Sequence, residues 1–322
     1  MNGNGRTILL AGGGRWGRVH ASNLSALLTS DDLVLWVTQH NQSAASDRVN
    51  GFPGGPRFRL LNRLEEALVV RPHAALIVTA ADSHVVVADR CLRRGISCLV
   101  EKPLAFRRAE ALSLAELAVN NGLILAVGLH LLSATYLRQF KSHVSGRELS
   151  QIEIRWFDAA HEVRYGERKA ADKQTPIVHD VYPHIWSIVR VLTGCDRQVI
   201  EDGSRIQQHN LAFRSWALGV RVLAYCGRQA GVRERKIKLD FRDGGIASLD
   251  FTNEPGQSRL DNAPLPSDPR WGIEPRPVMA EVRDFIEQIS SPLPDRTWPH
   301  LAENCIDSVI GAEALDVLLT RT

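Results

Sequence analysis

The sequence predicts an α/β protein that begins with a doubly wound, parallel β-sheet. Over the first 127 residues, short and almost continuous apolar runs alternate with helical patterns, as expected where helices bury strands on both faces. The first run also leads directly into a glycine-rich turn. Because 322 residues are enough for two domains, we expect a first domain at residues 1–127 and a second at residues 128–322.

The composition is that of an ordinary globular protein, with 44% apolar and 23% charged residues. It excludes a disordered tail, a collagen and a coiled-coil rod, and no apolar run approaches the roughly 18 residues that cross a bilayer. The net charge of +3 is spread along the chain, so we expect no nucleic-acid or membrane partner. Five cysteines without a CxxC pair, and an N-terminus without a signal-peptide pattern, favour a reducing, cytoplasmic compartment.

The apolar runs of the first domain predict buried strands at residues 8–11, 33–37, 74–78, 98–100 and 123–127. Two helices are well marked between them. One begins near the capping cluster Asp82-Ser83-His84 and ends at Gly95, and the other runs from about Arg108 to Asn120. Strand–helix alternation of this kind predicts βαβ units.

Gly12, Gly14 and Gly17 form a GxGxxG pattern between the first strand and the following helix. In a Rossmann domain, the first glycine permits a tight turn, the second lets the backbone approach a diphosphate, and the third lets helix and strand pack closely. A dinucleotide diphosphate would then bind at the positive end of the helix, beside Arg15 and Trp16. The alternative is a glycine-rich turn that binds no ligand.

The end of the second strand indicates which cofactor binds. NAD usually calls for an acidic residue there, but this chain reads Thr38-Gln39-His40-Asn41. A carboxylate would repel a 2′-phosphate, so its absence favours NADP, with Thr38 and His40 bonding the phosphate and Arg48 nearby. The alternative is that these are polar loop residues and that NAD binds without a carboxylate.

Lys102 is the first candidate for catalysis. It lies in Glu101-Lys102-Pro103, where a strand ends, and ligands collect outside the carboxyl ends of parallel strands. Pro103 restricts Lys102 to an extended conformation, and we expect Glu101 beside the cofactor. An ammonium held in this way can polarise a carbonyl or donate a proton to an alkoxide. The alternative is a solvated lysine at a strand end.

Taken together, the glycine pattern, His84 at the start of a helix and Glu101-Lys102-Pro103 resemble the Gfo/Idh/MocA oxidoreductase family. Val127-Gly128 and the stretch from Met279 to Leu319 are similar to its connecting strand and closing helices. The resemblance implies a Rossmann domain followed by an α/β domain with an open, mostly antiparallel sheet, and the final helix can pack back on the first domain. It also implies NAD(P)-dependent hydride transfer, commonly on sugars, inositols or related polyols.

The family's second catalytic motif, Asp-x-x-x-His on a helix, is matched by Asp180 and His184. Residues four apart lie on one face of a helix, and a carboxylate beside an imidazole raises its basicity. By resemblance, His184 is the acid or base, Asp180 binds substrate and steadies it, and Lys102 completes the triad. Because Pro183 suits a first turn, we expect the helix to begin near Asp180. The alternative is a capped helix start with a core histidine.

Departures from the family pattern concern the substrate. The segment from Thr175 to His179 stands where a Gly-Gly is frequent, and Ser187 stands where an Asp is frequent. Tyr182 and His179 add two proton-bearing groups, which we expect to contact substrate. A modified sugar, an imine or a biosynthetic intermediate would suit these changes.

The rest of the second domain shows strand patterns. Apolar and polar residues alternate over residues 151–157 and 236–242, and Asp243-Gly244-Gly245 predicts a hairpin turn into residues 246–251. The polar face of such a sheet is either solvated or paired with another subunit, and the resemblance favours a homodimer or homotetramer through it. Residues 253–277 hold six prolines and predict a long irregular segment, either a lid or a surface loop.

We therefore expect an NAD(P)-dependent oxidoreductase that transfers a hydride between nicotinamide and a sugar, polyol or related carbonyl substrate. One alternative is an imine (C=N) reductase in a biosynthetic pathway. Another, of a different class, is a dinucleotide-binding regulator without chemistry, although a regulator needs none of Lys102, Asp180 and His184. We expect no metal, because the histidines are scattered.

Overall fold

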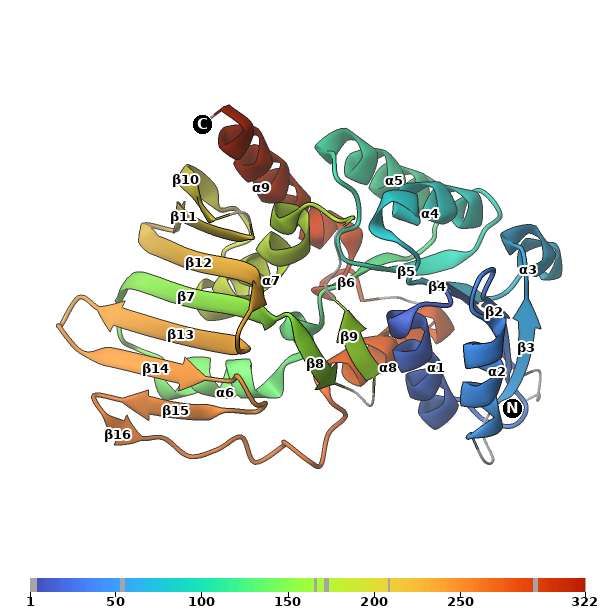
Figure 1. Cartoon of the computed structure of the whole chain (residues 1–322), viewed down its shortest axis with the longest axis horizontal. Helices are drawn as coiled ribbons and strands as arrows, with labels where there is room; N and C mark the ends of the chain where they lie inside the picture. The colour runs from blue at the N-terminus through green and yellow to red at the C-terminus, as the bar shows by residue number, and fades with distance from the viewer. Residues whose placement is uncertain are drawn as a thin grey trace. The chain divides into compact units, whose positions relative to one another are not determined.

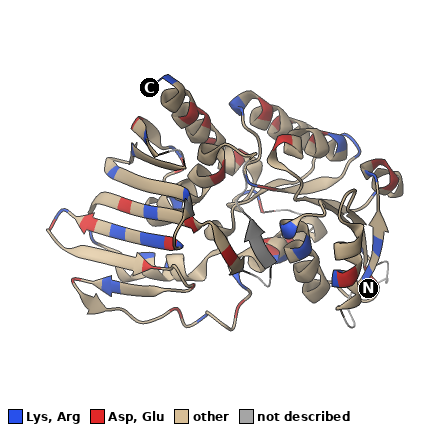
Figure 2. Ribbon diagram, viewed as in Figure 1, with Lys and Arg blue, Asp and Glu red and all other residues tan. Residues whose placement is uncertain are grey.

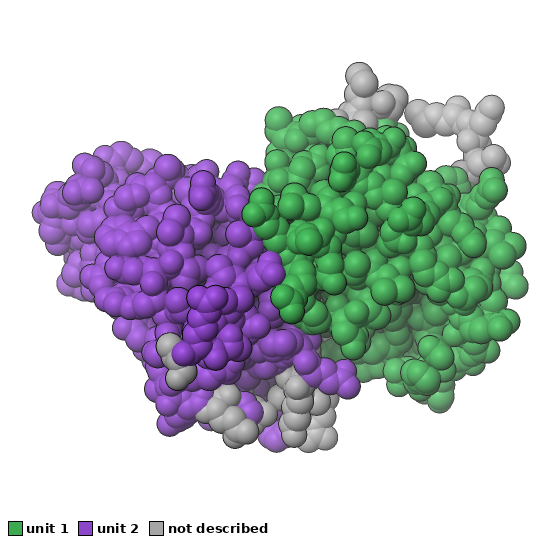
Figure 3. Space-filling view, turned by 90° about the horizontal axis from the view of Figure 1, so that it is seen from above, with its two compact units in different colours: residues 1–128, 163–168, 278–306 green, residues 129–162, 169–277, 307–322 purple. Residues whose placement is uncertain are grey.

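The computed structural model describes residues 5–52, 56–164, 167–170, 174–207, 209–291 and 295–321. The chain divides into two compact units, which Figure 3 shows in different colours. Unit 1 comprises residues 1–128, 163–168 and 278–306, and unit 2 comprises residues 129–162, 169–277 and 307–322. The first change of unit along the chain lies after Gly128, and the predicted domain bounds, 1–127 and 128–322, stay a prediction.

Unit 1 contains a fully parallel sheet of six strands in the order β3-β2-β1-β4-β5-β6. The strands are β1 (Thr7–Ala11), β2 (Leu33–Val37), β3 (Arg57–Leu61), β4 (Ala74–Ile77), β5 (Ser97–Glu101) and β6 (Leu125–Gly128). The five strands predicted from apolar runs are confirmed. The strand order reverses between β1 and β4, and in doubly wound sheets ligands bind at the carboxyl ends of the strands near such a point.

The strand that the apolar runs do not predict is β3. It lies at the edge of the sheet, and its Arg57 and Arg59 are exposed while Leu61 is buried. A strand with one open face alternates polar and apolar side chains, so it lacks the continuous apolar run of a central parallel strand.

Helices cover both faces of this sheet. Figure 1 shows α4 and α5 on one face and α1, α2 and α8 on the other. The bounds are α1 (Arg15–Leu27), α2 (Gln42–Asn50), α3 (Leu64–Val70), α4 (His84–Leu92), α5 (Arg108–Asn120) and α8 (Pro277–Ser290). The helix predicted over residues 108–120 is confirmed, and the one predicted from the Asp82-Ser83-His84 cluster starts at His84 after a 3-10 turn at Ala81–Ser83.

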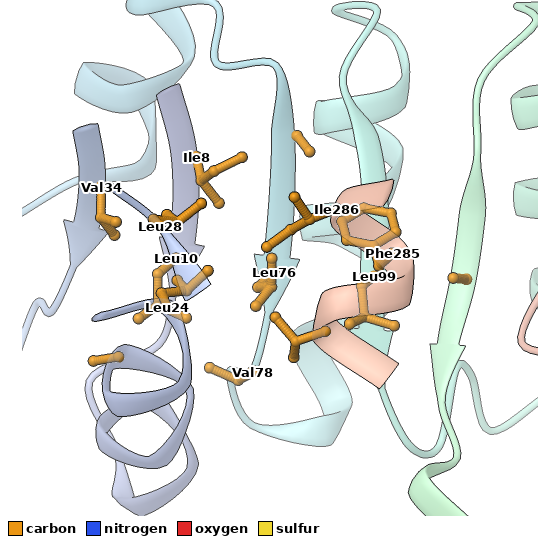
Figure 4. Packing of buried hydrophobic residues seen from close by; sticks show 14 of the residues in the cluster. Ile8, Leu10, Leu24, Leu28, Val34, Leu76, Val78, Leu99, Phe285 and Ile286 are labelled. Atoms are coloured by element: carbon orange, nitrogen blue, oxygen red, sulfur yellow. The ribbon is translucent and has the colours of Figure 1, made fainter. Parts of the chain in front are cut away.

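The face that carries α1 and α8 holds a hydrophobic cluster. Ile8 and Leu10 of β1, Leu76 of β4, Leu24 of α1 and Phe285 of α8 all belong to it (Figure 4). Burying a side chain such as Phe285 contributes about 1.5–3 kcal/mol. The apolar side of α8 therefore holds this C-terminal helix within unit 1.

Unit 2 contains an eight-stranded sheet in the order β10-β11-β12-β7-β13-β14-β15-β16. All neighbouring strands are antiparallel except the parallel pair β12 and β7, which confirms an open, mostly antiparallel sheet. The bounds are β7 (Leu149–Ala159), β10 (Val199–Gln207), β11 (Asn210–Ala217), β12 (Val220–Ala230), β13 (Glu234–Phe241), β14 (Ile246–Asp250), β15 (Gln257–Leu260) and β16 (Ala263–Pro264). The predicted hairpin is confirmed, because β13 pairs with β14. A separate pair consists of β8 (His161–Arg164) and β9 (Glu167–Ala170).

The proline-rich stretch at residues 253–277 is only partly irregular. Its residues 257–264 form the hairpin of β15 and β16 at the edge of the sheet, so the prediction of one long irregular segment is wrong there. Pro255 precedes β15 and Pro264 ends β16. Pro264 is tolerated because β16 is the edge strand, which leaves one row of N–H groups without a partner strand, and Pro255 lies outside the strands.

Helices cover one face of this sheet and charges line the other. Figure 1 shows α6 (Thr135–His143) and α7 (Ile177–Thr193) behind the strands, and α9 (Ala302–Arg321) closes the chain. On the open face, Figure 2 shows charged bands across β7 and β13. There Nε of Arg155 lies 3.0 Å from Glu234, and Nζ of Lys238 lies 3.0 Å from Asp240.

The start of α7 differs from the prediction. The helix begins at Ile177, with Pro176 as its N-cap, so the expectation of a start near Asp180 is wrong and Pro183 lies inside the helix. A proline inside a helix costs about 3 kcal/mol, because one backbone hydrogen bond is lost. Burial of almost every side chain of α7 offsets that cost.

None of the described helices is both long and apolar enough to span a bilayer.

Candidate active site

Two close backbone approaches build the glycine turn. Gly12 has a φ of +129°, and a Cβ atom on it would lie 2.5 Å from the carbonyl oxygen of Val78. A Cβ atom on Gly17 would lie 2.0 Å from the carbonyl oxygen of Gly12. The indole Nε1 of Trp36 donates a hydrogen bond of 2.8 Å to the same oxygen. The turn itself therefore requires glycine at positions 12 and 17.

Gly14 differs from these two glycines. Its φ of −73° is open to any residue, and a Cβ atom on it would meet no atom within 4 Å. Gly14 is the N-cap of α1, makes no side-chain cap, and is followed by a first turn without an acidic residue. Backbone N–H groups at such a helix start attract anions. The open space at Gly14 therefore fits a dinucleotide diphosphate.

Arg15 and Trp16 lie at this helix start. Cζ of Arg15 is 5.1 Å from the centroid of the Trp16 ring, within the range of a cation–π contact. The pair places a positive charge and an aromatic ring directly after Gly14, where the sequence predicts a cofactor contact.

Of the three polar residues expected near the ribose, Thr38 and His40 directly follow β2, whereas Arg48 lies on α2. Thr38 is fully buried, and its Oγ1 has no hydrogen-bond partner in the described part of the chain, whereas His40 is exposed. Arg48 contacts α1 instead, because its Nε and Nη2 lie 3.0 and 2.6 Å from Oγ of Ser22. Thr38 and His40 therefore remain candidates for a ribose or 2′-phosphate contact, and Arg48 is engaged elsewhere.

Lys102 directly follows β5, at the carboxyl edge of the parallel sheet. The side chain of Glu101 is fixed by two contacts: Nε2 of His20 lies 3.0 Å from its Oε1, and the backbone N–H of Lys102 donates to its Oε2 at 3.2 Å. A Cβ atom on Gly128 would lie 3.3 Å from the carboxyl carbon of Glu101. Glu101 is thus packed against β6 and α1, where it orients the backbone that carries Lys102.

His84 supports the same strand end from the other side of Pro103. Its Nδ1 lies 2.8 Å from the carbonyl oxygen of Pro103, and its Nε2 lies 3.2 Å from that of Thr79. Burial lowers the pKa of His84, although the two carbonyl contacts act in the opposite direction. His84 therefore joins the start of α4 to the loop after Lys102.

Glu281 of α8 is a fully buried carboxyl group near this cluster. Neither of its oxygens has a hydrogen-bond partner among the described residues, and Nδ1 of His300 lies 3.7 Å from Oε2. Burial, followed by the carboxylates of Glu101 and Asp284, raises the pKa of Glu281 well above its ordinary value. Glu281 therefore keeps its proton at pH values at which ordinary carboxyl groups have lost theirs.

In unit 2, α7 presents Asp180 and His184 on one face, because the two residues are one helical turn apart. Nη1 of Arg228, on β12, lies 3.6 Å from Oδ2 of Asp180 and donates at 2.9 Å to the carbonyl oxygen of Thr175. Arg228 therefore ties the start of α7 to the sheet and places a positive charge beside Asp180.

His184 lies in an aromatic cluster. Its ring stacks on Trp156 of β7, with centroids 4.3 Å apart and planes at 19°, and it meets the edge of His130 at 5.4 Å. The guanidinium of Arg235 lies 3.7 Å from the centroid of the Trp156 ring. His184 is 8% exposed, so the orientation of its ring is determined by the side chains packed around it.

Tyr182 and His179 point elsewhere. A Cβ atom on Gly311 of α9 would lie 2.1 Å from the hydroxyl oxygen of Tyr182, and Nε2 of His179 lies 3.8 Å from Asp316 of the same helix. Both residues are buried, and burial raises the pKa of the Tyr182 hydroxyl. The two groups that we expected to contact substrate therefore face α9, on the other side of α7 from Asp180 and His184, and we leave them out of the proposed site.

Sequence reasoning missed five residues that contact these groups or their neighbours, and one buried carboxyl group: His20, His130, Trp156, Arg228, Arg235 and Glu281. A signal exists for three of them. His20 has the helical spacing of Trp16 and Leu24, and Glu281 has that of Val278 and Phe285. Arg235 lies at alternate positions of its strand with Ile237 and Leu239, on the same face. Each is a polar side chain on the apolar side of its own helix or strand, where an unpaired group is costly.

Among the described residues, no three His, Cys, Asp or Glu side chains gather as metal ligands would.

Comparison with known proteins bears on both units. Residues 6–129 match a family model described as an oxidoreductase family with an NAD-binding Rossmann fold, named Gfo/Idh/MocA. Residues 6–129 therefore match the Rossmann domain of the Gfo/Idh/MocA oxidoreductase family. The resemblance and the prediction of an oxidoreductase are thereby confirmed, and the family's NAD-binding fold is the one into which Gly12, Gly14 and Gly17 are built.

Similar proteins also match the part of the chain that follows residue 129. The chain is 24% identical over 304 residues to UDP-N-acetylglucosamine 3-dehydrogenase of Acidithiobacillus ferrooxidans, which covers 88% of each chain. The solved structure of that enzyme, GnnA, matches 98% of each chain with a TM-score of 0.78 at 19% identity. KijD10, a 3-ketoreductase from Actinomadura kijaniata solved with NADP and TDP-benzene, matches 98% of each chain with a TM-score of 0.76 at 16% identity. The structural matches confirm the fold of both units.

Proposed function

We propose that this oxidoreductase oxidises a hydroxyl group, or reduces a ketone, of a nucleotide-linked sugar. The observation that carries the proposal is the pair of Asp180 and His184 on one face of α7, each held by a neighbour from the sheet of unit 2. The similarity to a UDP-N-acetylglucosamine 3-dehydrogenase and to a 3-ketoreductase supports this substrate class.

Each candidate residue has one role in the proposed reaction. When bound, the nicotinamide ring supplies or accepts the hydride. His184 accepts the proton of the substrate hydroxyl during oxidation and returns it during reduction. Lys102 has the role of an ammonium that donates a hydrogen bond to a substrate oxygen and stabilises negative charge there. Asp180 binds the substrate and steadies His184.

We propose NADP as the preferred cofactor, with NAD as the alternative. The end of β2 has no carboxylate that would repel a 2′-phosphate, and Thr38 offers a buried hydroxyl there. The NADP in the KijD10 structure supports the same choice. Arg48 contacts Ser22, so we propose that Thr38 and His40 bind the 2′-phosphate of NADP.

The test combines cofactor binding with substrate turnover. Thermal-shift titrations with NADPH and NADH identify the cofactor, because a ligand at a hundredfold excess over its Kd adds about 2.7 kcal/mol to the free energy of unfolding. Turnover is then followed by nicotinamide absorbance with UDP-N-acetylglucosamine, TDP-glucose, myo-inositol and a cyclic imine. We expect turnover with a nucleotide-linked sugar, and a loss of at least about a hundredfold in kcat for Lys102→Ala and for His184→Ala.

Lys141→Ala, which removes an exposed lysine of α6, is the control and should keep wild-type kcat. Turnover of myo-inositol or the imine alone would overturn the substrate class. Binding of NADPH without turnover of any substrate would favour a dinucleotide-binding regulator instead.

We also propose that copies of the chain associate through the open face of the unit 2 sheet. Trp216 is 40% exposed on that face, and Leu223 and Tyr225 are half-buried among its charges. Light scattering coupled to size exclusion should report a dimer or tetramer, and Trp216→Glu should lower the mass. Val69→Glu, an equally drastic change at an exposed position of α3, should leave the mass unchanged.

A further inference from the structure

A tryptophan and an arginine form a cross-strand pair on the helix-covered face of the unit 2 sheet. Trp156 of β7 is directly opposite Arg235 of β13 in the antiparallel register, and both are buried. The next covered positions of β13 are Ile237 and Leu239. A guanidinium is therefore buried in a row of β13 that is otherwise apolar, which an ordinary sheet core does not need.

Arg235 is fixed by backbone and carboxylate acceptors. Its Nη1 lies 2.6 Å from the carbonyl oxygen of Phe157 and 2.8 Å from that of Glu234, and its Nη2 bonds the carboxylate of Asp158. The residue is 1% exposed. A buried ion pair seldom improves on an apolar pair of the same size for stability, so the position calls for another explanation.

The Trp156 ring contacts both this cation and His184. Its centroid is 3.7 Å from Cζ of Arg235 and 4.3 Å from the centroid of the His184 ring. The Nε1 of Trp156 is buried and has no hydrogen-bond partner among the described residues, which costs free energy that a phenylalanine would avoid. Among aromatic side chains, however, an indole has the largest ring system for stacking and makes the strongest cation–π contact.

We propose that Trp156, held by Arg235, is a positioning residue that fixes the ring plane of His184 and so directs one imidazole nitrogen at the substrate hydroxyl. The inference rests on the proposed function, in which His184 moves the proton. Rotation of the imidazole about its Cβ–Cγ bond would break the stack with Trp156, and the His130 ring packs against the same imidazole at a steep angle of 68°. A general base acts only within hydrogen-bond reach and along the right direction.

The activity test compares two substitutions of one ring. Trp156→Leu removes the aromatic ring that stacks on His184. It should lower kcat about a hundredfold, which is the loss expected when a catalytic group is misplaced by roughly 1 Å. KM and the Kd of NADPH should change less than twofold. Trp156→Phe keeps an aromatic face and should restore kcat to within about fivefold of wild type. In a His184→Ala background, Trp156→Leu should cause no further loss, because it acts through that imidazole.

Leu239→Ala is the matched control, since Leu239 lies on the same covered face of β13 farther from the stack. It should destabilise the protein to a similar extent and leave kcat unchanged. Should Leu239→Ala lower kcat as much as Trp156→Leu, or should Trp156→Leu keep wild-type kcat, the positioning role would be overturned.

A measurement without substrate separates this inference from the proposed function. In NMR spectra of histidine-labelled protein, the ring protons of His184, assigned with His184→Gln, should be shifted upfield by the Trp156 ring current. Trp156→Leu should abolish the shift and Trp156→Phe should retain part of it. An unshifted His184 in the wild-type protein would overturn the stack whatever the activity, whereas a shifted His184 in a protein without turnover would leave the stack intact and refute the proposed function.

Discussion

His20 and Glu101 join the helix after the glycine turn to the strand end that carries Lys102. Nε2 of His20 lies 3.0 Å from Oε1 of Glu101, and the His20 side chain is 1% exposed. Glu101 in turn accepts the backbone N–H of Lys102 at 3.2 Å. One pair of side chains therefore connects α1, whose start fits a diphosphate, to the backbone of the proposed catalytic lysine.

His20→Leu should lower the free energy of unfolding by about 1.5–3 kcal/mol, because a hydrogen bond to a charged group is lost and Glu101 is left half-buried without this donor. His20→Gln keeps an N–H at similar reach and should lose less. Urea unfolding followed by tryptophan fluorescence gives the free energies, and kcat should fall along with them because Lys102 is no longer held. Wild-type stability in His20→Leu would show that the pair contributes nothing.

Gly14 and Gly17 should respond to alanine in opposite ways. Gly14→Ala places a methyl group where no atom lies within 4 Å, so the free energy of unfolding should change by less than about 1 kcal/mol. The Kd of NADPH should nevertheless rise at least about tenfold, since the methyl group enters the space that fits the diphosphate. Fluorescence titration of NADPH measures this change.

Gly17→Ala is the matched comparison, because its methyl group would lie 2.0 Å from the carbonyl oxygen of Gly12. Overpacking of this kind typically costs about 1–3 kcal/mol of stability. A Gly14→Ala protein that binds NADPH as tightly as the wild type would place the diphosphate elsewhere.

Glu281→Gln should stabilise the protein, and more so at higher pH. Burial, with Glu101 and Asp284 nearby, raises the folded-state pKa of Glu281 above its unfolded value. Between these two values the unfolded chain releases a proton that the folded protein keeps, so Glu281 lowers stability progressively as pH rises through that window. Glutamine has the same shape and no proton to lose. Urea unfolding at pH 5 and pH 8 should therefore show a larger gain at pH 8, and equal gains at both would contradict the raised pKa.

The central strands of unit 1 could be predicted because each carries its own signal. A strand buried on both faces reads as a continuous apolar run, and the glycine spacing of the first turn is local in sequence. The edge strand β3 has no such run, since Arg57 and Arg59 face water. The early start of α7 was equally hidden, because burial of the whole helix outweighs the preference of Pro183 for a first turn.

In the candidate site, too, residues in local motifs could be predicted and residues that depend on distant segments could not. Lys102, Asp180 and His184 could be proposed from the sequence because their motifs are short and contiguous. Their supporting partners depend on pairing between distant segments: Trp156 meets Arg235 only through the register of β7 with β13. The contacts of Tyr182 and His179 with α9 were hidden for the same reason, because the sequence of α7 does not say that α9 packs against that side.

Arg228 should matter to activity through Asp180. Its Nη1 is 3.6 Å from the Asp180 carboxylate and bonds the carbonyl oxygen of Thr175, so it fixes both the charge and the helix start. Arg228→Met should lower kcat/KM about 10- to 100-fold, the equivalent of roughly 1.4–2.7 kcal/mol of transition-state stabilisation. Arg228→Lys keeps the charge without the planar fork and should recover only part of the loss.

A double-mutant cycle decides whether Arg228 acts on Asp180 or on the substrate itself. If Arg228 works by orienting the carboxylate, Arg228→Met should cost little more once Asp180→Asn has removed the charge that it orients. Fully additive losses would mean that Arg228 contacts the substrate independently. The cycle needs only kcat/KM for four proteins, and circular dichroism of each confirms that α7 is still folded.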